Sequence, residues 1–201
     1  MENKSKLNSS IALLFRTHPE LGALVGLVLI FIVFCFTATR FLSLESLAGI
    51  VTVASELGIV AAGITFLMIT GEFDLSVGST FGFSAMILAI TANAGIPLGI
   101  GFLLALSAAF FIGLINGIIT VKYKIPSFIT TLGTLMFWRG ILLAVTGGFA
   151  VRYWGTSSFL HGLNGHFLGE FRTSSIWFFI IIFSLNIILT KTPYGNSTYA
   201  T

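Results

Sequence analysis

The stretch Thr70-Gly71-Glu72-Phe73-Asp74-Leu75-Ser76-Val77-Gly78-Ser79 decides the fold of this chain, because it interrupts a long apolar run. Without it, residues 49–93 would form one apolar segment of roughly 45 residues, whereas a bilayer core takes about 20 helical residues per crossing. The stretch therefore marks the junction of two membrane crossings, or a break inside one. Its two glycines permit a sharp, non-helical backbone, and Asp74 or Ser76 can cap the helix that follows.

Two interpretations of this stretch are open at the level of sequence. In the first, it is a tight turn between helices with a capped helix start. In the second, it is a break beside a transport path, where irregular backbone at membrane depth lines a cavity. Glu72 and Asp74 are two positions apart, so we expect their carboxylates on different faces of the backbone rather than as a paired catalytic site. Asp74 is then expected to be a structural cap.

The composition places the chain among integral membrane proteins. Of its 201 residues, 56% are hydrophobic and 8% are charged, whereas soluble domains average about 25% charged residues. The formal net charge of +3 is too small to indicate nucleic-acid binding. The single cysteine, Cys35, lies in the first apolar run and cannot form an internal disulfide. That run lacks a small-residue cleavage signature, which predicts a membrane anchor rather than a removed signal peptide.

Apolar runs separated by turn signals predict an all-α, polytopic transmembrane helical bundle. A polar, cytoplasmic N-terminal segment, residues 1–20, precedes a transmembrane domain that covers residues 21–201. Spans are expected at residues 21–39, 47–69, 77–94, 98–121, 126–146 and 175–190. A longer connection at residues 149–174 carries aromatic residues that indicate an interfacial helix and an aromatic belt.

Lysine and arginine are unevenly distributed between the two sides that six spans would create. One side collects six of them, Lys4, Lys6, Arg16, Lys122, Lys124 and Lys191, and the other collects three, Arg40, Arg152 and Arg172. Because positive residues accumulate in cytoplasmic loops, both ends are expected to be cytoplasmic. The stretch 70–79 then lies toward the cytoplasm, and residues 149–174 lie outside.

Several motifs in register resemble the ribose-type permeases, the membrane subunits of ABC importers for monosaccharides and related small solutes. Residues 71–79 resemble the family signature GG-I-D-L-S-V-G-S, although Glu72 and Phe73 replace the commoner Gly-Ile pair. Residues 113–117 (GLING) resemble G-x-x-N-G, and residues 125–134 (IPSFITTLGT) resemble P-x-F-I-x-T-L-G-T. Residues 139–140 and 146–148 fall where the family has R-G and T-G-G. The resemblance covers nearly all of residues 45–201.

The resemblance implies a permease subunit that is not itself an enzyme. The chain carries no Walker A sequence, so ATP would be used by a partner ATPase subunit, and this chain would bind no cofactor. The other implied partners are a periplasmic sugar-binding protein, a second permease subunit in a homo- or heterodimer, and the lipid of a bacterial inner membrane. About six of the roughly ten spans expected for the family are present, so the chain looks truncated at its C-terminus.

The signature motif supplies one set of predicted site residues: Gly71, Glu72, Asp74, Ser76, Gly78 and Ser79. A second set is predicted along the substrate pathway: Glu56, Asn116, Thr130 and Thr134. Each of these four also has a plain structural role. Glu56 can be a hydrogen-bonded acid between helices, Asn116 can join two helices, and threonine hydroxyls bond back to their own helix. No further metal-ligating residues stand at ligand spacing from the three histidines, so no metal site is predicted.

Two rival functions belong to other classes. An ion-coupled secondary transporter would use Glu56, Glu72 or Asp74 as a proton or sodium site, since intramembrane acids and broken helices fit such proteins. A membrane-embedded enzyme has less support, because no spaced His/Asp/Glu or Ser/His constellation is present.

Overall fold

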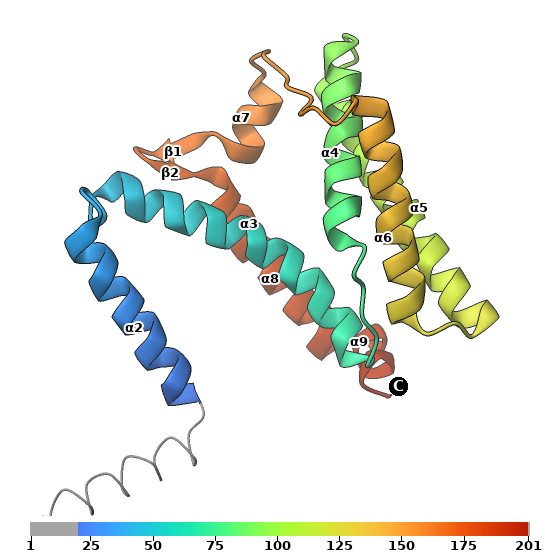
Figure 1. The fold of residues 1–201 in the computed structure, drawn as a ribbon. Helices are drawn as coiled ribbons and strands as arrows, with labels where there is room; N and C mark the ends of the chain where they lie inside the picture. The colour runs from blue at the N-terminus through green and yellow to red at the C-terminus, as the bar shows by residue number, and fades with distance from the viewer. Residues whose placement is uncertain (1–19, 201) are drawn as a thin grey trace, which may run out of the picture. The chain divides into compact units, whose positions relative to one another are not determined.

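Helices account for most of the computed structural model, which describes residues 20–200 (Figure 1). In chain order the elements are α2 (Glu20–Thr37), α3 (Leu44–Ile69), α4 (Val77–Asn93), α5 (Leu98–Tyr123), α6 (Ser127–Thr146), α7 (Ser158–Asn164), β1 (His166–Leu168), β2 (Phe171–Arg172), α8 (Thr173–Lys191) and α9 (Pro193–Tyr199). The predicted helical bundle is confirmed, and the short β-hairpin is an addition to it. The predicted polar segment at residues 1–20 lies outside the described residues, apart from the backbone of Glu20.

The six predicted spans correspond to six apolar helices. By length and composition α3, α5, α6 and α8 are long and apolar enough to cross a membrane, and shorter apolar helices occupy Leu24–Thr37 and Val77–Asn93. The largest difference is at the start of α3, which was expected at Leu47 and begins at Leu44. The cause is a cap: the backbone N–H of Ser46 donates to the Ser43 hydroxyl over 3.2 Å, which satisfies an amide of the first turn.

The chain divides into two compact units, residues 1–50 and 51–201, with the boundary inside α3. In the described part of the first unit, the turn after α2 is held by aromatic packing. The ring of Phe41 lies 5.4 Å from that of Phe31 and 5.6 Å from that of Phe34, measured between centroids. Such ring pairs stabilise by about 1 kcal/mol beyond the area they bury, so the turn is a packed element rather than a free linker.

Within the second unit, α4, α5 and α6 lie side by side (Figure 1). At one end of this group the stretch 70–79 reaches the start of α6, where the backbone N–H of Phe73 donates to the Ser127 hydroxyl over 3.2 Å. At the other end, the Asn93 side-chain amide donates to the carbonyl of Arg152 over 2.9 Å. The two ends therefore carry the connections that the sequence assigns to opposite sides of the membrane.

Small, polar and a few apolar side chains share the interior of this helix group, and its exterior is apolar. Buried polar side chains include Ser76, Ser79, Asn116, Thr130 and Thr131, whereas large apolar side chains such as Phe110 and Val121 are exposed. In lipid, apolar side chains gain nothing by turning inward, so small and polar residues mediate the contacts between helices. This distribution is the one expected of a protein whose outer surface meets lipid.

The connection between α6 and α8 contains the helix predicted there and a hairpin that was not predicted. Helix α7 begins at a cap, because the N–H of Phe159 donates to the Ser157 hydroxyl over 3.2 Å. The antiparallel strands β1 and β2 pair His166 with Arg172 and Leu168 with Phe171. The hairpin escaped prediction because two or three residues per strand are too few to show the alternating pattern of a sheet.

Candidate functional site

Helix α3 ends where the stretch 70–79 begins. The N–H groups of Gly71 and Glu72 donate to the carbonyls of Met68 and Leu67 over 3.1 and 3.2 Å, and Gly71 has φ +79°. This is a Schellman motif, in which glycine supplies the left-handed residue after the helix. Gly78 lies in the first turn of α4 instead. The prediction that both glycines shape the bend is therefore correct for Gly71 and wrong for Gly78.

After the end of α3, the backbone has no regular secondary structure at residues 72–74 and is bonded to α6. The N–H of Phe73 donates to the Ser127 hydroxyl over 3.2 Å, and the N–H of Leu75 donates to the Thr131 hydroxyl over 3.1 Å. The hydroxyls of Ser127 and Thr131, four residues apart on one face of α6, therefore bind two amides that are two residues apart in the stretch 70–79.

The opposite edge of the segment is fastened to α5 through Ser76, which is fully buried. The Asp74 Oδ1 atom accepts from the backbone N–H and the hydroxyl of Ser76 over 2.7 and 2.6 Å. The Ser76 hydroxyl in turn accepts from the Asn116 amide over 2.9 Å. The predicted cap thus takes a different form: Asp74 binds the amide just ahead of α4, and the Ser76 side chain makes no capping bond to that helix. Asn116 joins two helices, as its structural role predicted.

A cavity of about 370 Å³ opens where these elements meet. It is lined by Leu67, Thr70, Glu72, Phe73, Asp74, Gly113, Asn116, Gly117, Thr120, Val121, Ser127 and Thr131. Both acids of the stretch line it, so the expectation that they point to different faces is wrong. Residues i and i+2 lie on opposite sides of a helix, whereas the backbone at residues 72–74 is not helical.

The other residues predicted along the substrate pathway lie elsewhere. Thr130 is buried with no hydrogen-bond partner for its hydroxyl, and Thr134 donates to the carbonyl of Thr131 over 3.3 Å. Neither residue lines the cavity. Glu56 accepts from the Asn164 amide over 3.3 Å, which ties α3 to the end of α7. Of the four pathway residues, only Asn116 belongs to the cavity.

The cavity is also lined by polar residues that were not among the predicted site residues. They are Thr70, Thr120, Ser127 and Thr131. The spacing of Ser127 and Thr131 on one face of α6 was a usable signal, because residues four apart on a helix are neighbours. Thr70 and Thr120 gave no such signal, since their inclusion depends on which helix ends meet.

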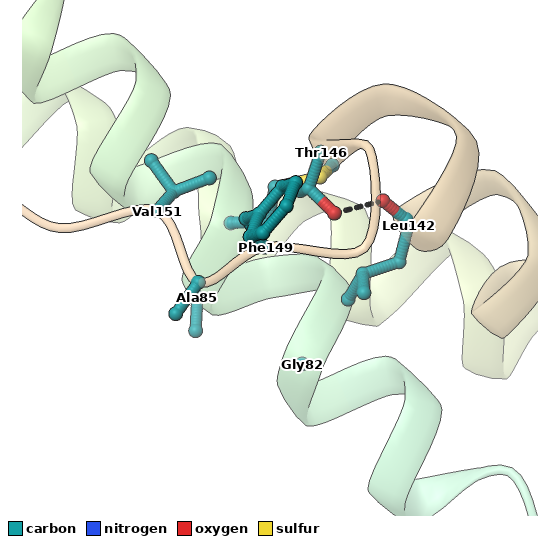
Figure 2. A pocket seen from close by; sticks show the side chains of 8 residues that line it. Gly82, Ala85, Leu142, Thr146, Phe149 and Val151 are labelled. Atoms are coloured by element: carbon teal, nitrogen blue, oxygen red, sulfur yellow. Dashed lines mark hydrogen bonds between the residues drawn. The ribbon is translucent and has the colours of Figure 1, made fainter.

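A second, smaller cavity of about 190 Å³ lies at the other end of the α4–α6 contact. Figure 2 shows the ring of Phe149 lying across it between Thr146 and Ala85. Its one polar side chain, Thr146, donates its hydroxyl to the carbonyl of Leu142 over 2.9 Å. The lining is otherwise apolar, so this space is a packing gap and the first cavity is the candidate site.

Comparison with known proteins identifies the family. Residues 46–201 match the family described as "Branched-chain amino acid transport system / permease component". The chain is 36% identical to the autoinducer 2 import system permease protein LsrC of Escherichia coli O9:H4 (strain HS), over 92% of this chain and 54% of that relative. It is 32% identical to the same-named protein of Photorhabdus laumondii over 94% of this chain and 56% of the relative. The protein of that name from Salmonella typhi is 35% identical, over 92% and 53%.

The chain spans about half the length of the curated relatives it matches. No solved structure matches it. The resemblance to ribose-type importer permeases, drawn from motifs at residues 71–79, 113–117 and 125–134, is confirmed by these relatives. The chain therefore belongs to the permease-component family of the branched-chain amino acid transport system type.

Proposed function

We propose that the chain forms part of the membrane permease of an ABC importer, and that the importer carries a monosaccharide-like solute across a bacterial inner membrane. The observation that carries this proposal is the polar cavity at the break between two apolar helices, in a chain of a permease family. In this proposal a partner ATPase hydrolyses ATP, a periplasmic binding protein delivers the solute, and a second permease subunit completes the pathway. The chain itself catalyses no reaction and binds no cofactor.

The lining of the cavity supports a polyhydroxylated solute over an amino acid. Hydroxyl, amide and carboxylate groups face the space, and the described residues that line it include no Lys or Arg. The α-carboxylate of an amino acid would find no cationic partner there, which is expensive in a partly desolvated site. The hydroxyls of a sugar, in contrast, can donate to carboxylate and hydroxyl oxygens such as those of Glu72 and Ser127. D-ribose and autoinducer 2, the solute in the relatives' name, are the first solutes to test.

We further propose that the N-terminus is cytoplasmic, so that the cavity opens toward the cytoplasm. The support is the excess of Lys and Arg at the end of the helices where the stretch 70–79 lies. Lys122 is in the last turn of α5 at this end, whereas Arg152 is at the opposite end beside Asn93.

Uptake assays test the transport proposal. Asn116→Ala is introduced at the chromosomal locus, and uptake of labelled D-ribose, autoinducer 2 and leucine is measured at equal membrane abundance. We expect a fall of at least tenfold for one of the first two solutes and no leucine uptake attributable to the locus. Ser184→Ala is the control, because this exposed hydroxyl in α8 bonds only back to the carbonyl of Ile180. Loss of leucine uptake alone would overturn the solute class.

An ion-coupled transporter remains the second candidate, because two carboxylates line the cavity. The two functions differ in their energy source. A protonophore applied while cellular ATP is maintained should leave uptake intact for an ABC importer. Uptake that collapses with the proton gradient at normal ATP would favour the ion-coupled transporter instead.

A further inference from the structure

The C-terminal half of α5 carries an open groove with an apolar wall. The groove has a volume of about 410 Å³ and is lined by Gly113, Leu114, Gly117, Ile118, Val121 and Lys122. Its two glycines are four residues apart, so they lie on one face of the helix, and both are exposed. A Cβ atom at either glycine would meet no atom within 4 Å outside its own stretch of helix. The missing side chains therefore leave a hollow that no neighbouring described helix fills.

The groove differs in charge from the candidate solute cavity. Gly113, Gly117 and Val121 border both spaces, whereas Ile118 and Lys122 line the groove and not the cavity. Two carboxylates line the cavity, while the described lining of the groove contains no acid and one ammonium group. An anionic group is therefore repelled from the cavity and attracted to the lysine at the end of the groove.

The positive charge is concentrated at one end of the groove. Lys122 lies in the last turn of α5, and Lys124 follows the helix directly. The Lys122 Nζ atom lies 5.9 Å from the centroid of the exposed Tyr123 ring. Among the described residues, neither lysine is paired with a carboxylate. Lysine and tyrosine at the end of a spanning helix are typical of the level of the lipid headgroups, so the apolar wall leads to a cationic end at this level.

We propose that the groove binds one anionic glycerophospholipid, with an acyl chain along the wall from Gly113 to Val121 and the phosphate at Lys122 and Lys124. The eight residues from Gly113 to Val121 rise about 12 Å along the helix axis. One leaflet of the hydrocarbon core is about 15 Å deep, half of the full thickness of about 30 Å. An acyl chain of one leaflet therefore runs along the whole groove when its headgroup reaches the lysines. Basic pockets beside spanning helices are known to bind anionic headgroups.

A second copy of the chain fits the groove less well than a lipid does. Two glycines four residues apart can admit a neighbouring helix, but the charge at Lys122 disfavours this contact. Two copies with the same orientation in the membrane are related by an axis perpendicular to it, so equal residues meet at equal depth. Pairing through this groove would bring the two Lys122 side chains together, whereas a lipid phosphate compensates the charge. Lipid binding does not depend on which solute the permease carries.

Competition between lipids tests the proposal. The purified chain in a neutral detergent is titrated with phosphatidylglycerol that carries a fluorescent acyl chain, and the anisotropy is measured. We expect one saturable site per chain, from which phosphatidylglycerol displaces the label at least tenfold more effectively than phosphatidylcholine with the same acyl chains. Lys122→Gln should weaken binding at least fivefold. Lys191→Gln is the matched control, because this exposed lysine ends α8 and does not line the groove.

A second measurement protects against a variant that fails to fold. Phosphatidylglycerol should raise the midpoint of thermal unfolding of the unmodified chain and of Lys191→Gln, and should raise it less in Lys122→Gln. The absence of a saturable site, equal displacement by the two lipids, or equal weakening by the two Lys→Gln changes would overturn the proposal.

Two further outcomes would assign the groove to another occupant and overturn the proposal as well. Glycerol 3-phosphate carries the charge without the acyl chains, and we expect no displacement by it at the same concentration. Displacement by it as readily as by the lipid would mean that the lysines bind a soluble phosphate. Release of the lipid when the chain dimerises at higher protein concentration would mean that a second copy occupies the groove.

Discussion

Ser76 is central to the site, because its side chain is bonded both to Asp74 in the stretch 70–79 and to Asn116 on α5. It is fully buried, donates to Asp74 and accepts from Asn116. A buried chain of hydrogen bonds of this kind stabilises one arrangement of its members. Loss of the Ser76 hydroxyl leaves the Asn116 amide without its acceptor, whereas Asp74 keeps the backbone N–H of residue 76. The identity of residue 76 is therefore set by two contacts, one local and one with a helix far along the chain.

Ser76→Ala should lower the free energy of unfolding by roughly 1–3 kcal/mol, because it leaves the buried Asn116 amide without its acceptor. Ser184→Ala removes an exposed hydroxyl of the same size and should change stability by less than about 0.5 kcal/mol. Thermal unfolding of both purified variants in one detergent measures the difference. Equal midpoints for the two variants would contradict the role given to Ser76.

At the scale of the element, the non-helical residues 72–75 are held by hydroxyls of α6 rather than by a sheet. Thr131 accepts the N–H of Leu75 while donating to the carbonyl of Ser127. Thr134, one turn further along, bonds only to the carbonyl of Thr131. The two threonines therefore differ in whether they contact the broken segment, although both lie on the first turns of the same helix.

Thr131→Val keeps the shape of the side chain and removes the acceptor of the Leu75 amide. Hydrogen exchange in peptides covering residues 70–79 should accelerate by about tenfold, which corresponds to roughly 1.4 kcal/mol of lost protection. Thr134→Val should leave exchange in these peptides unchanged. Acceleration by both substitutions alike would mean that α6 is loosened generally and that the Thr131 contact is not the cause.

The two glycines of the same element should respond to alanine in opposite directions. Gly71 has φ +79°, a conformation that costs a residue with a Cβ roughly 1–2 kcal/mol, so Gly71→Ala should destabilise. Gly78 is helical, and a Cβ at this position would meet no described atom within 4 Å beyond its own helix neighbours. Gly78→Ala should therefore stabilise by about 0.5–1 kcal/mol. Thermal unfolding decides, and destabilisation by Gly78→Ala would indicate a close contact with another chain at this position.

Comparison of these elements shows which features of the structure the sequence predicts and which it does not. The helices were predictable because apolar length and turn residues depend only on neighbouring positions, and their ends deviate by a few residues, as at Ser43. The prediction missed that Glu72 and Asp74 line the same cavity, because this depends on the path of the non-helical backbone between α3 and α4. Thr120 was missed because its place in the cavity depends on which helix ends meet. Local structure was thus predictable from the sequence, whereas the residues that line the cavity could be identified only from the packing of the helices.

At the scale of the whole molecule, the orientation in the membrane decides which solution the cavity faces. Within the second unit, the stretch 70–79 and the start of α6 share one end of the helix group, and Asn93 and Arg152 share the other. Connections that a chain crossing the membrane back and forth would place on the same side therefore lie at the same end of the helix group. The assignment of one end to the cytoplasm rests on the distribution of Lys and Arg.

Cysteine labelling tests this orientation at both ends of the second unit. In a Cys35→Ala background, Thr156→Cys places a thiol on the exposed connection after α6, and Tyr123→Cys places one at the exposed end of α5. Neither side chain takes part in the hydrogen bonds of the cavity, so neither change should disturb the fold. A membrane-impermeant maleimide added to spheroplasts should label Thr156→Cys at once and Tyr123→Cys only after the membrane is permeabilised. The reverse pattern would place the cavity on the outer face, and the excess of Lys and Arg at that end would then need another explanation.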